Sequence, residues 1–214
     1  TKVCERDMLV NTPILEAYVS ILEKVISIST SYLKDSVLSI NPFGFRTYFR
    51  GKDNGDIKIL TSKGWSKVNR TEITKGIEYI DQYKIIVGRF VPSNGEMSVK
   101  PGEGYRVLTE PQILSPAEIN TETYIDTAVF STPEEATNYK KYLLSKFARF
   151  LLRQGITSVN VTRECFAFVP QQDFTSSSDI DWYKSVSEID KQLYMKYHLT
   201  NEEISFIESM IKPM

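Results

Sequence analysis

Hydrophobic and polar residues alternate with a helical period between residues 133 and 153. Apolar side chains recur three or four positions apart at Ala136, Tyr139, Leu143 and Phe147. This spacing places them on one face of a helix. We expect that face to be buried against a sheet.

Local signals mark both ends of this segment. Thr132 is a favourable N-cap, Pro133 suits the first helical position, and Glu135 completes a Thr-x-x-Glu capping box. Gly155 provides a stop signal at the other end. The sequence therefore predicts one continuous helix over residues 133–153.

The opposite side of this helix carries polar residues at steps of four, namely Lys141, Ser145, Arg149 and Arg153. One interpretation is a solvated face that keeps the helix soluble. The other is a stripe of side chains that contacts phosphates. The pattern alone leaves both interpretations open.

Strand-like segments flank the predicted helix. Residues 123–130 are rich in Thr, Tyr, Ile and Val, and residues 161–169 end in an apolar run before Pro170. Because a helix connects them, we expect the two strands to be parallel neighbours.

Weaker patterns predict the remaining elements. They are a helix over 12–37 with a break near Ser29, strands over 57–60, 84–91 and 105–109, a strand after the turn at Gly64, a loop over 92–104, and helices over 187–196 and 200–211. Together they predict an α+β fold, in which a twisted mixed β-sheet is packed by the central helix with helical segments at both ends.

Composition shifts suggest three segments. We expect a helical connector over 1–40, an α+β domain over 41–172 and a helical extension over 173–214, with a Ser-rich linker at 176–178. The chain begins at Thr1 rather than Met, which suggests a fragment of a longer protein.

Composition also narrows the class of protein. Hydrophobic residues make up 41% and charged residues 25% of 214 residues, which indicates a globular chain. No apolar run spans a bilayer and no signal-peptide pattern is present, so we expect a cytoplasmic protein without a membrane partner. Cys4 and Cys165 are too few for a disulfide framework or a metal site. His198 is the only histidine, which argues against Ser–His–Asp catalysis.

Charge is unevenly distributed along the chain. Residues 41–106 hold twelve basic and seven acidic residues, a net charge of +5, whereas residues 173–214 carry −4. Within the basic region, Arg46, Thr47 and Arg50 alternate with aromatic residues. Such a loop suits contact with nucleic acid. The alternative is an aromatic plug with solubilising arginines.

Other motifs are weaker. Asp56-x-Lys58 could be half of a nuclease metal site, although such triplets are common by chance. Gly102-x-Gly104 has no helix after it and indicates a turn rather than a dinucleotide fingerprint. The Asn-Pro start at Asn41 lacks the second Pro and the preceding strand of a methyltransferase Asn-Pro-Pro-Tyr loop, so we reject it as that motif.

Several stretches of the chain resemble a known family. From about residue 12 to the end, the chain is similar to the C-terminal part of bacterial adenine-N6 DNA methyltransferases of restriction–modification systems. The stretches are NPFGFRTYFRG, KIIVGRF, INTETYI, EEATNYKKYLLSKFARFLL and KQLYMKYHLTNEEISFIESMIKPM. The strand–helix–Gly–strand–Pro pattern of residues 120–170 is also similar to target recognition domains of type I specificity subunits.

This resemblance implies a DNA-methylase specificity-domain fold that reads double-stranded DNA. It would present the target adenine to a separate catalytic methyltransferase domain of the same polypeptide, in a methyltransferase or a fused type II restriction enzyme. In the family, that catalytic domain binds S-adenosylmethionine through a Gly-containing loop and holds adenine with the Asn-Pro-Pro-Tyr loop. Neither motif occurs here, so we expect no catalytic residue and no cofactor in this chain.

The residues proposed to contact DNA lie in loops or at strand ends, where they could line one cleft. Basic side chains would bind phosphates, and Arg, Asn or Thr would read base edges. The candidates are Arg46, Thr47, Arg50, Lys63, Arg89, Lys100, Thr121, Thr123, Tyr124, Thr162 and Arg163.

Two other functions stay open. One is a metal-dependent nuclease that uses Asp56, Lys58 and a distant acid. The other is a protein-interaction module whose surface is formed by the aromatic C-terminal helices.

Overall fold

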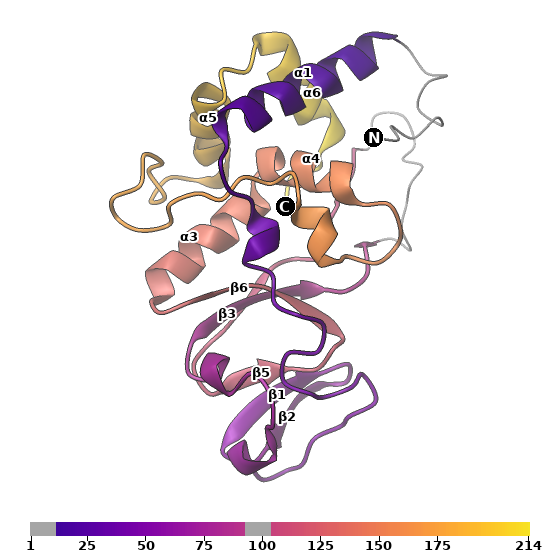
Figure 1. The fold of residues 1–214 in the computed structure, drawn as a ribbon, viewed down its shortest axis with the longest axis vertical. Helices are drawn as coiled ribbons and strands as arrows, with labels where there is room; N and C mark the ends of the chain where they lie inside the picture. The colour runs from indigo at the N-terminus through magenta and orange to yellow at the C-terminus, as the bar shows by residue number, and fades with distance from the viewer. Residues whose placement is uncertain (1–11, 93–103) are drawn as a thin grey trace.

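A computed structural model describes residues 12–92 and 104–214 of the chain. Figure 1 shows the helices gathered at one end of the molecule and the strands at the other. The helices are α1 (Thr12–Ile28), α3 (Pro133–Leu144), α4 (Lys146–Gly155), α5 (Val186–Lys196) and α6 (Asn201–Met210). The strands are β1 (Ile57–Thr61), β2 (Gly64–Val68), β3 (Tyr83–Gly88), β4 (Gln112–Leu114), β5 (Glu118–Asn120) and β6 (Tyr124–Phe130).

The strands form two three-stranded sheets rather than the single sheet expected. In one sheet β1 pairs antiparallel with β2 and parallel with β5. In the other, β3 lies between β4 and β6 and is antiparallel to both. The α+β class is confirmed.

Three layers follow from the burial pattern. The main hydrophobic cluster joins the five helices to one face of β3 and β6, through residues such as Ile85 and Ala128. Leu60 and Ile86 pack between the two sheets together with Leu114. A separate cluster around Ile59 covers the far face of sheet β2-β1-β5, which has the shorter strands and is called the smaller sheet below. The order of layers is therefore helices, sheet β4-β3-β6, then sheet β2-β1-β5 (Figure 1).

The predicted helix over 133–153 is broken at Ser145, so that prediction was wrong. Ser145 has extended backbone angles, and its hydroxyl accepts a hydrogen bond from the N–H of Ala148 as the N-cap of α4. Asp190 of α5 accepts from the N–H groups of Lys146 and Phe147. The chain can leave the helix here because a hydroxyl and a distant carboxylate satisfy the donors that the break exposes.

Both interpretations of the polar face of this segment are wrong for its central residues. Ser145 is fully buried and Arg149 is 1% exposed. The Arg149 guanidinium donates to the carbonyl of Lys212 at 2.6 Å, and burial lowers its pKa to about 10. The Lys141 ammonium donates to the carbonyl of Trp182 at 2.6 Å. Arg149 and Lys141 therefore bond to backbone carbonyls of the C-terminal region.

The strand predicted over 161–169 is absent, and its parallel pairing with β6 was wrong. The segment contains a 3-10 helix, η4 (Arg163–Phe166), and the neighbour of β6 is β3. A Cβ atom at Gly155 would lie 2.5 Å from the carbonyl oxygen of Cys165. The chain therefore turns back closely over the end of α4, which glycine permits, instead of extending beside the sheet.

The structure confirms some of the remaining predicted helices and strands and corrects others. The break near Ser29 is confirmed, since α1 ends at Ile28, and only a short 3-10 helix, η1 (Leu33–Asp35), follows it. The strand predicted over 105–109 is reduced to a bridge between Tyr105 and Ile211. The two C-terminal helices are confirmed, including the Thr200 capping box. They share the main hydrophobic cluster with α3 and α4, and the predicted division at residues 40 and 172 stays a prediction.

A buried polar pair lies between the two sheets. Asp126 Oδ2 accepts a hydrogen bond from Asn120 Nδ2 at 2.9 Å, whereas the described residues supply no partner for Oδ1 of either residue. The nearby Lys84 ammonium donates to backbone carbonyls of Tyr79, Ile80 and Gln82. Burial raises the pKa of Asp126 to about 7, against the opposing effects of Asn120 and Lys84.

Phe147 should be essential to the core. Its ring is buried and stacks on Tyr197 with centroids 4.9 Å apart. We expect Phe147→Ala to lower the free energy of unfolding by about 3–5 kcal/mol. The exposed Lys191 provides a control on α5, and Lys191→Ala should change it by less than about 0.5 kcal/mol. Equal shifts of the two variants in urea unfolding would contradict this packing.

Asp126 should make stability depend on pH. Its folded pKa of about 7 lies above the unfolded value of about 3.9, so the folded state holds a proton between these pH values. Its contribution to stability is complete below about pH 4 and is lost as pH rises to about 7. Relative to Asp126→Asn, the wild type should lose up to about 4 kcal/mol of unfolding free energy over that range. Urea unfolding of both proteins at pH 4, 5.5, 7 and 8 measures this, and parallel pH profiles would contradict it.

Candidate nucleic-acid interface

The loop that carries Arg46 and Arg50 packs on the turn between β1 and β2. The Arg50 guanidinium donates to the carbonyl of Thr47 at 2.9 Å and to the hydroxyl of Ser62 at 3.2 Å. The Ser62 hydroxyl in turn donates to the Thr47 carbonyl. Lys63 follows in this turn, where its side chain is exposed. Loop and turn therefore present their cations on one surface.

The aromatic-plug interpretation of the loop is confirmed for two of its side chains, and contact with nucleic acid stays a prediction. The ring centroids of Phe45 and Phe49 lie 4.5 Å apart, and both rings pack against the hydrophobic cluster of the smaller sheet. They therefore form the aromatic plug. Tyr48 is 77% exposed and the two arginines face solvent. The plug anchors the loop, and the polar side chains lie at the solvent-exposed surface.

Glu122 connects this loop to the start of β6. Its carboxylate lies 3.0 Å from the Arg46 guanidinium and accepts from the N–H of Thr47 at 3.3 Å. Its own N–H donates to the carbonyl of Phe45. One acidic residue thus fixes the loop and neutralises one of its two arginines.

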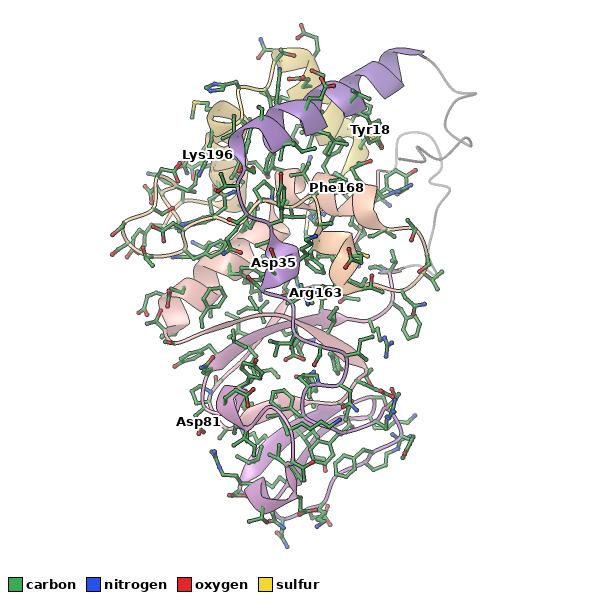
Figure 2. The ribbon with its side chains drawn as sticks, in the orientation of Figure 1. Tyr18, Asp35, Asp81, Arg163, Phe168 and Lys196 are labelled. Carbon is green, nitrogen blue, oxygen red and sulfur yellow. The ribbon has the colours of Figure 1, made fainter. Side chains whose placement is uncertain are left out.

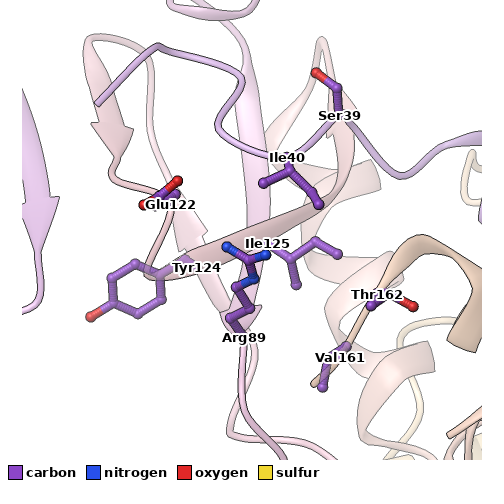
Figure 3. A pocket seen from close by; sticks show the side chains of 8 residues that line it. All are labelled: Ser39, Ile40, Arg89, Glu122, Tyr124, Ile125, Val161 and Thr162. Carbon is purple, nitrogen blue, oxygen red and sulfur yellow. The ribbon is translucent and has the colours of Figure 1, made fainter. Parts of the chain in front are cut away.

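A small, shallow hollow that is open to solvent lies beside Glu122. Figure 3 shows the Arg89 side chain pointing into it from the end of β3. The Arg89 backbone bonds to Thr123 and Val161, which positions the side chain between two segments. The lining residues are Ser39, Ile40, Arg89, Glu122, Tyr124, Ile125, Val161 and Thr162.

We call the continuous region formed by this loop, the β1–β2 turn and the hollow the strand-end surface. It comprises Arg46, Thr47, Tyr48, Arg50, Lys63, Trp65, Arg89, Glu122, Tyr124 and Thr162. It lies where β1 and β3 end and β6 begins.

Most of the candidate residues predicted from the sequence lie on or next to this surface. Thr121 is the exception among the threonines, because it is buried and its hydroxyl donates to that of Thr123 at 3.0 Å, which shapes the turn before β6. The Arg163 side chain points elsewhere, to the carbonyl of Lys34 at 2.7 Å and the carboxylate of Asp35 (Figure 2). Lys100 lies outside the described residues.

Three cations on this surface have no acidic partner. Within residues 12–92 and 104–214, no carboxylate lies within ion-pair distance of Arg50, Lys63 or Arg89. Much of the remaining positive charge of the region is neutralised locally, in the pairs Lys52–Glu72, Lys58–Glu118 and Arg70–Asp81. The strand-end surface thus groups three cations that lack an acidic partner among the described residues, and Lys67, Lys75 and Arg106 elsewhere in the region lack one as well.

Sequence reasoning missed Trp65 and the non-basic lining of the hollow. Trp65 is 51% exposed, although it lies within β2. A signal was present, because Lys63, Trp65 and Lys67 are spaced two apart, which in a strand places neighbours of this kind on one face. Glu122 had no comparable signal, since it meets Arg46 across 76 residues of chain.

The other two functions gain no support from these side chains. Asp56 Oδ1 accepts from the N–H of Arg70, and Lys58 pairs with Glu118, so both halves of the nuclease triplet have structural roles. In the described part of the chain no group of three His, Cys, Asp or Glu residues could hold a metal ion. Trp182 and Tyr197 of the C-terminal region are buried in the core rather than displayed for a partner.

Comparison with protein-family models, with curated proteins and with solved structures gives no match. Among the described residues, no helix has both the length and the apolar character needed to cross a bilayer.

Proposed function

We propose that this chain is the DNA target recognition region of a bacterial adenine-N6 DNA methyltransferase or fused type II restriction enzyme. It binds double-stranded DNA through the strand-end surface and acts with a catalytic methyltransferase domain of the same polypeptide. The observation that supports the DNA-binding part is the grouping at one end of the strands of Arg50, Lys63 and Arg89, for which the described residues supply no carboxylate partner. The methyltransferase part rests on the sequence resemblance.

The geometry of each cation favours a particular contact. Arg50 is held by Thr47 and Ser62, so its remaining N–H groups can meet a phosphate without a large loss of side-chain freedom. Arg89 is recessed in the hollow, which also suits a protruding phosphate better than a base edge. Arg46 is exposed but paired with Glu122, so reading a guanine would require exchange of that partner.

The cofactor belongs to the catalytic domain in this proposal. The Gly-containing loop and the Asn-Pro-Pro-Tyr loop of the family do not occur in this sequence. We therefore expect calorimetry to detect no complex between this chain and S-adenosylmethionine at micromolar concentrations. A specific complex would contradict the assignment of this chain as a region separate from catalysis.

DNA binding should depend steeply on salt. Fluorescence anisotropy with a labelled duplex should give dissociation constants of roughly 10⁻⁴ to 10⁻⁶ M at physiological salt, with a log–log slope of about −0.9 per phosphate contact. Arg50→Gln and Arg89→Gln should each reduce the slope by about one. Lys191→Gln, on α5, is the matched control and should leave both affinity and slope unchanged.

Removing the negative charge of Glu122 tests the interface in the opposite direction, because DNA binding should become tighter. Glu122→Gln removes the carboxylate that neutralises Arg46 and adds one positive charge to the strand-end surface. We expect tighter duplex binding and a slope steeper by about one, a gain that a merely destabilised variant would not show. Flat salt dependence in the wild type, or weaker binding by a folded Glu122→Gln, would contradict the proposed interface.

A further inference from the structure

Two aromatic side chains lie exposed among the cations of the strand-end surface. Tyr48 belongs to the anchored loop, and Trp65 lies on the edge strand β2. In the register of the smaller sheet Trp65 is opposite Leu60, a member of the buried cluster against which Tyr124 of the hollow packs. This register places Trp65 at the end of the smaller sheet where Leu60 and Tyr124 lie.

The positive charges near Trp65 would be stabilised by a bound anion. Lys67, two residues along β2, lies directly opposite Lys58 of β1, and like charges in this position repel each other. Glu118 of β5 compensates Lys58 at 3.2 Å, but in the described part of the chain no carboxylate compensates Lys67. Lys63 lies in the β1–β2 turn on the other side of Trp65 along the chain, and Arg50 packs on that turn. The exposed indole thus lies between the positions of Lys63 and Lys67 along the strand.

We propose that Trp65 stacks on a DNA base that has left the helical stack, so that the strand-end surface favours DNA with unpaired bases over a fully paired duplex. In a paired duplex both faces of each base are covered by neighbours, and an indole gains little there. An unpaired base exposes its π face, and phosphates on either side of it can meet Lys67, Lys63 and Arg50. This inference rests on the proposed DNA-binding function and deepens it.

The experiment compares two labelled DNAs that share one sequence in the labelled strand. One is fully paired, and the other has three mismatched bases opposite its centre. Wild type should bind the mismatched DNA more tightly. Trp65→Ala should lose on the order of 5- to 150-fold in affinity for the mismatched DNA, the range for loss of one stacked base. Its affinity for the paired duplex should change by less than about twofold.

Tyr183→Ala provides the matched control. Tyr183 is 89% exposed but lies in the C-terminal region, outside the strand-end surface. Its replacement should leave the affinity for both DNAs unchanged. Thermal unfolding of both alanine variants checks that each is folded, as expected for side chains outside the core.

Intrinsic fluorescence gives a direct signal of stacking. The chain has two tryptophans, and Trp182 is only 3% exposed, so quenching by DNA reports on Trp65. Mismatched DNA should quench the emission of the wild type more strongly than the duplex does. Trp65→Phe should remove this quenching and retain much of the binding, because phenylalanine can still stack.

The outcomes separate the two proposals. If neither DNA binds even at low salt, the proposed function fails. If both DNAs bind with equal affinity, with no loss in Trp65→Ala and no quenching, the surface binds DNA but Trp65 does not stack, and only this inference is overturned.

Discussion

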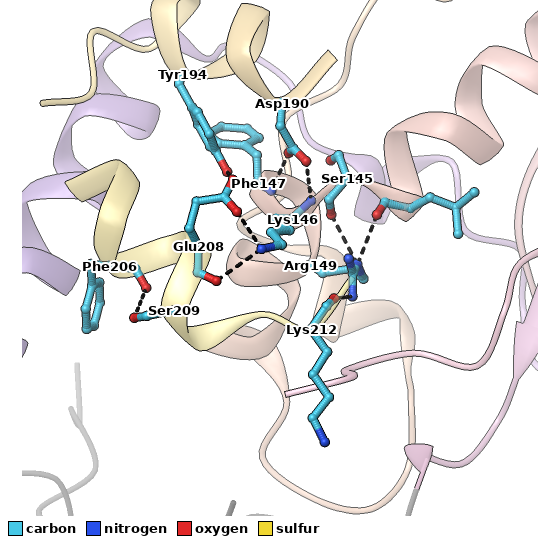
Figure 4. Close-up of polar contacts among 11 residues, drawn as sticks. Ser145, Lys146, Phe147, Arg149, Asp190, Tyr194, Phe206, Glu208, Ser209 and Lys212 are labelled. Atoms are coloured by element: carbon cyan, nitrogen blue, oxygen red, sulfur yellow. Dashed lines mark hydrogen bonds and ion pairs between the residues drawn. The ribbon is translucent and has the colours of Figure 1, made fainter. Parts of the chain in front are cut away.

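The helical layer depends on how the break between α3 and α4 is satisfied. Asp190 reaches from α5 to accept hydrogen bonds from Lys146 N–H at 3.0 Å and Phe147 N–H at 2.9 Å, in a site where burial raises its pKa to about 6 (Figure 4). Without this carboxylate, two backbone donors at the edge of the core would lose their partners, which is costly. The C-terminal region is therefore part of the packing that allows α4 to form where it does.

Further contacts extend this joint to the end of the chain. Glu208 of α6 accepts from the Lys146 ammonium and from the Tyr194 hydroxyl, and Arg149 holds the carbonyl of Lys212 (Figure 4). The helices thus form one connected layer on the face of β3 and β6. Because these strands are backed in this way, their ends hold Arg89 and Tyr124 in fixed positions, as a binding surface requires.

Local signals in the sequence predicted what depends on local chemistry. The N-caps at Thr132 and Thr200 start helices, and β6 coincides closely with the strand-forming run. The break at Ser145 escaped prediction because the acceptor that stabilises it is 45 residues away in the chain. The 161–169 segment has strand-like composition, but its approach to Gly155 is a tertiary contact. The same holds for the candidate site. Its basic residues could be predicted from the sequence, whereas the ion pair of Arg163 with Asp35 could not.

The charge distribution gains meaning only after these contacts are known. A net charge of +5 over residues 41–106 would fit many proteins, and several of its cations turn out to be paired with carboxylates on the same sheet or loop. On the strand-end surface Glu122 engages Arg46, and among the described residues no carboxylate pairs with Arg50, Lys63 or Arg89. Unpaired cations cost stability through mutual repulsion. An anionic ligand at the same place would relieve that repulsion, and for this reason local imbalance is a better guide to a nucleic-acid surface than net charge.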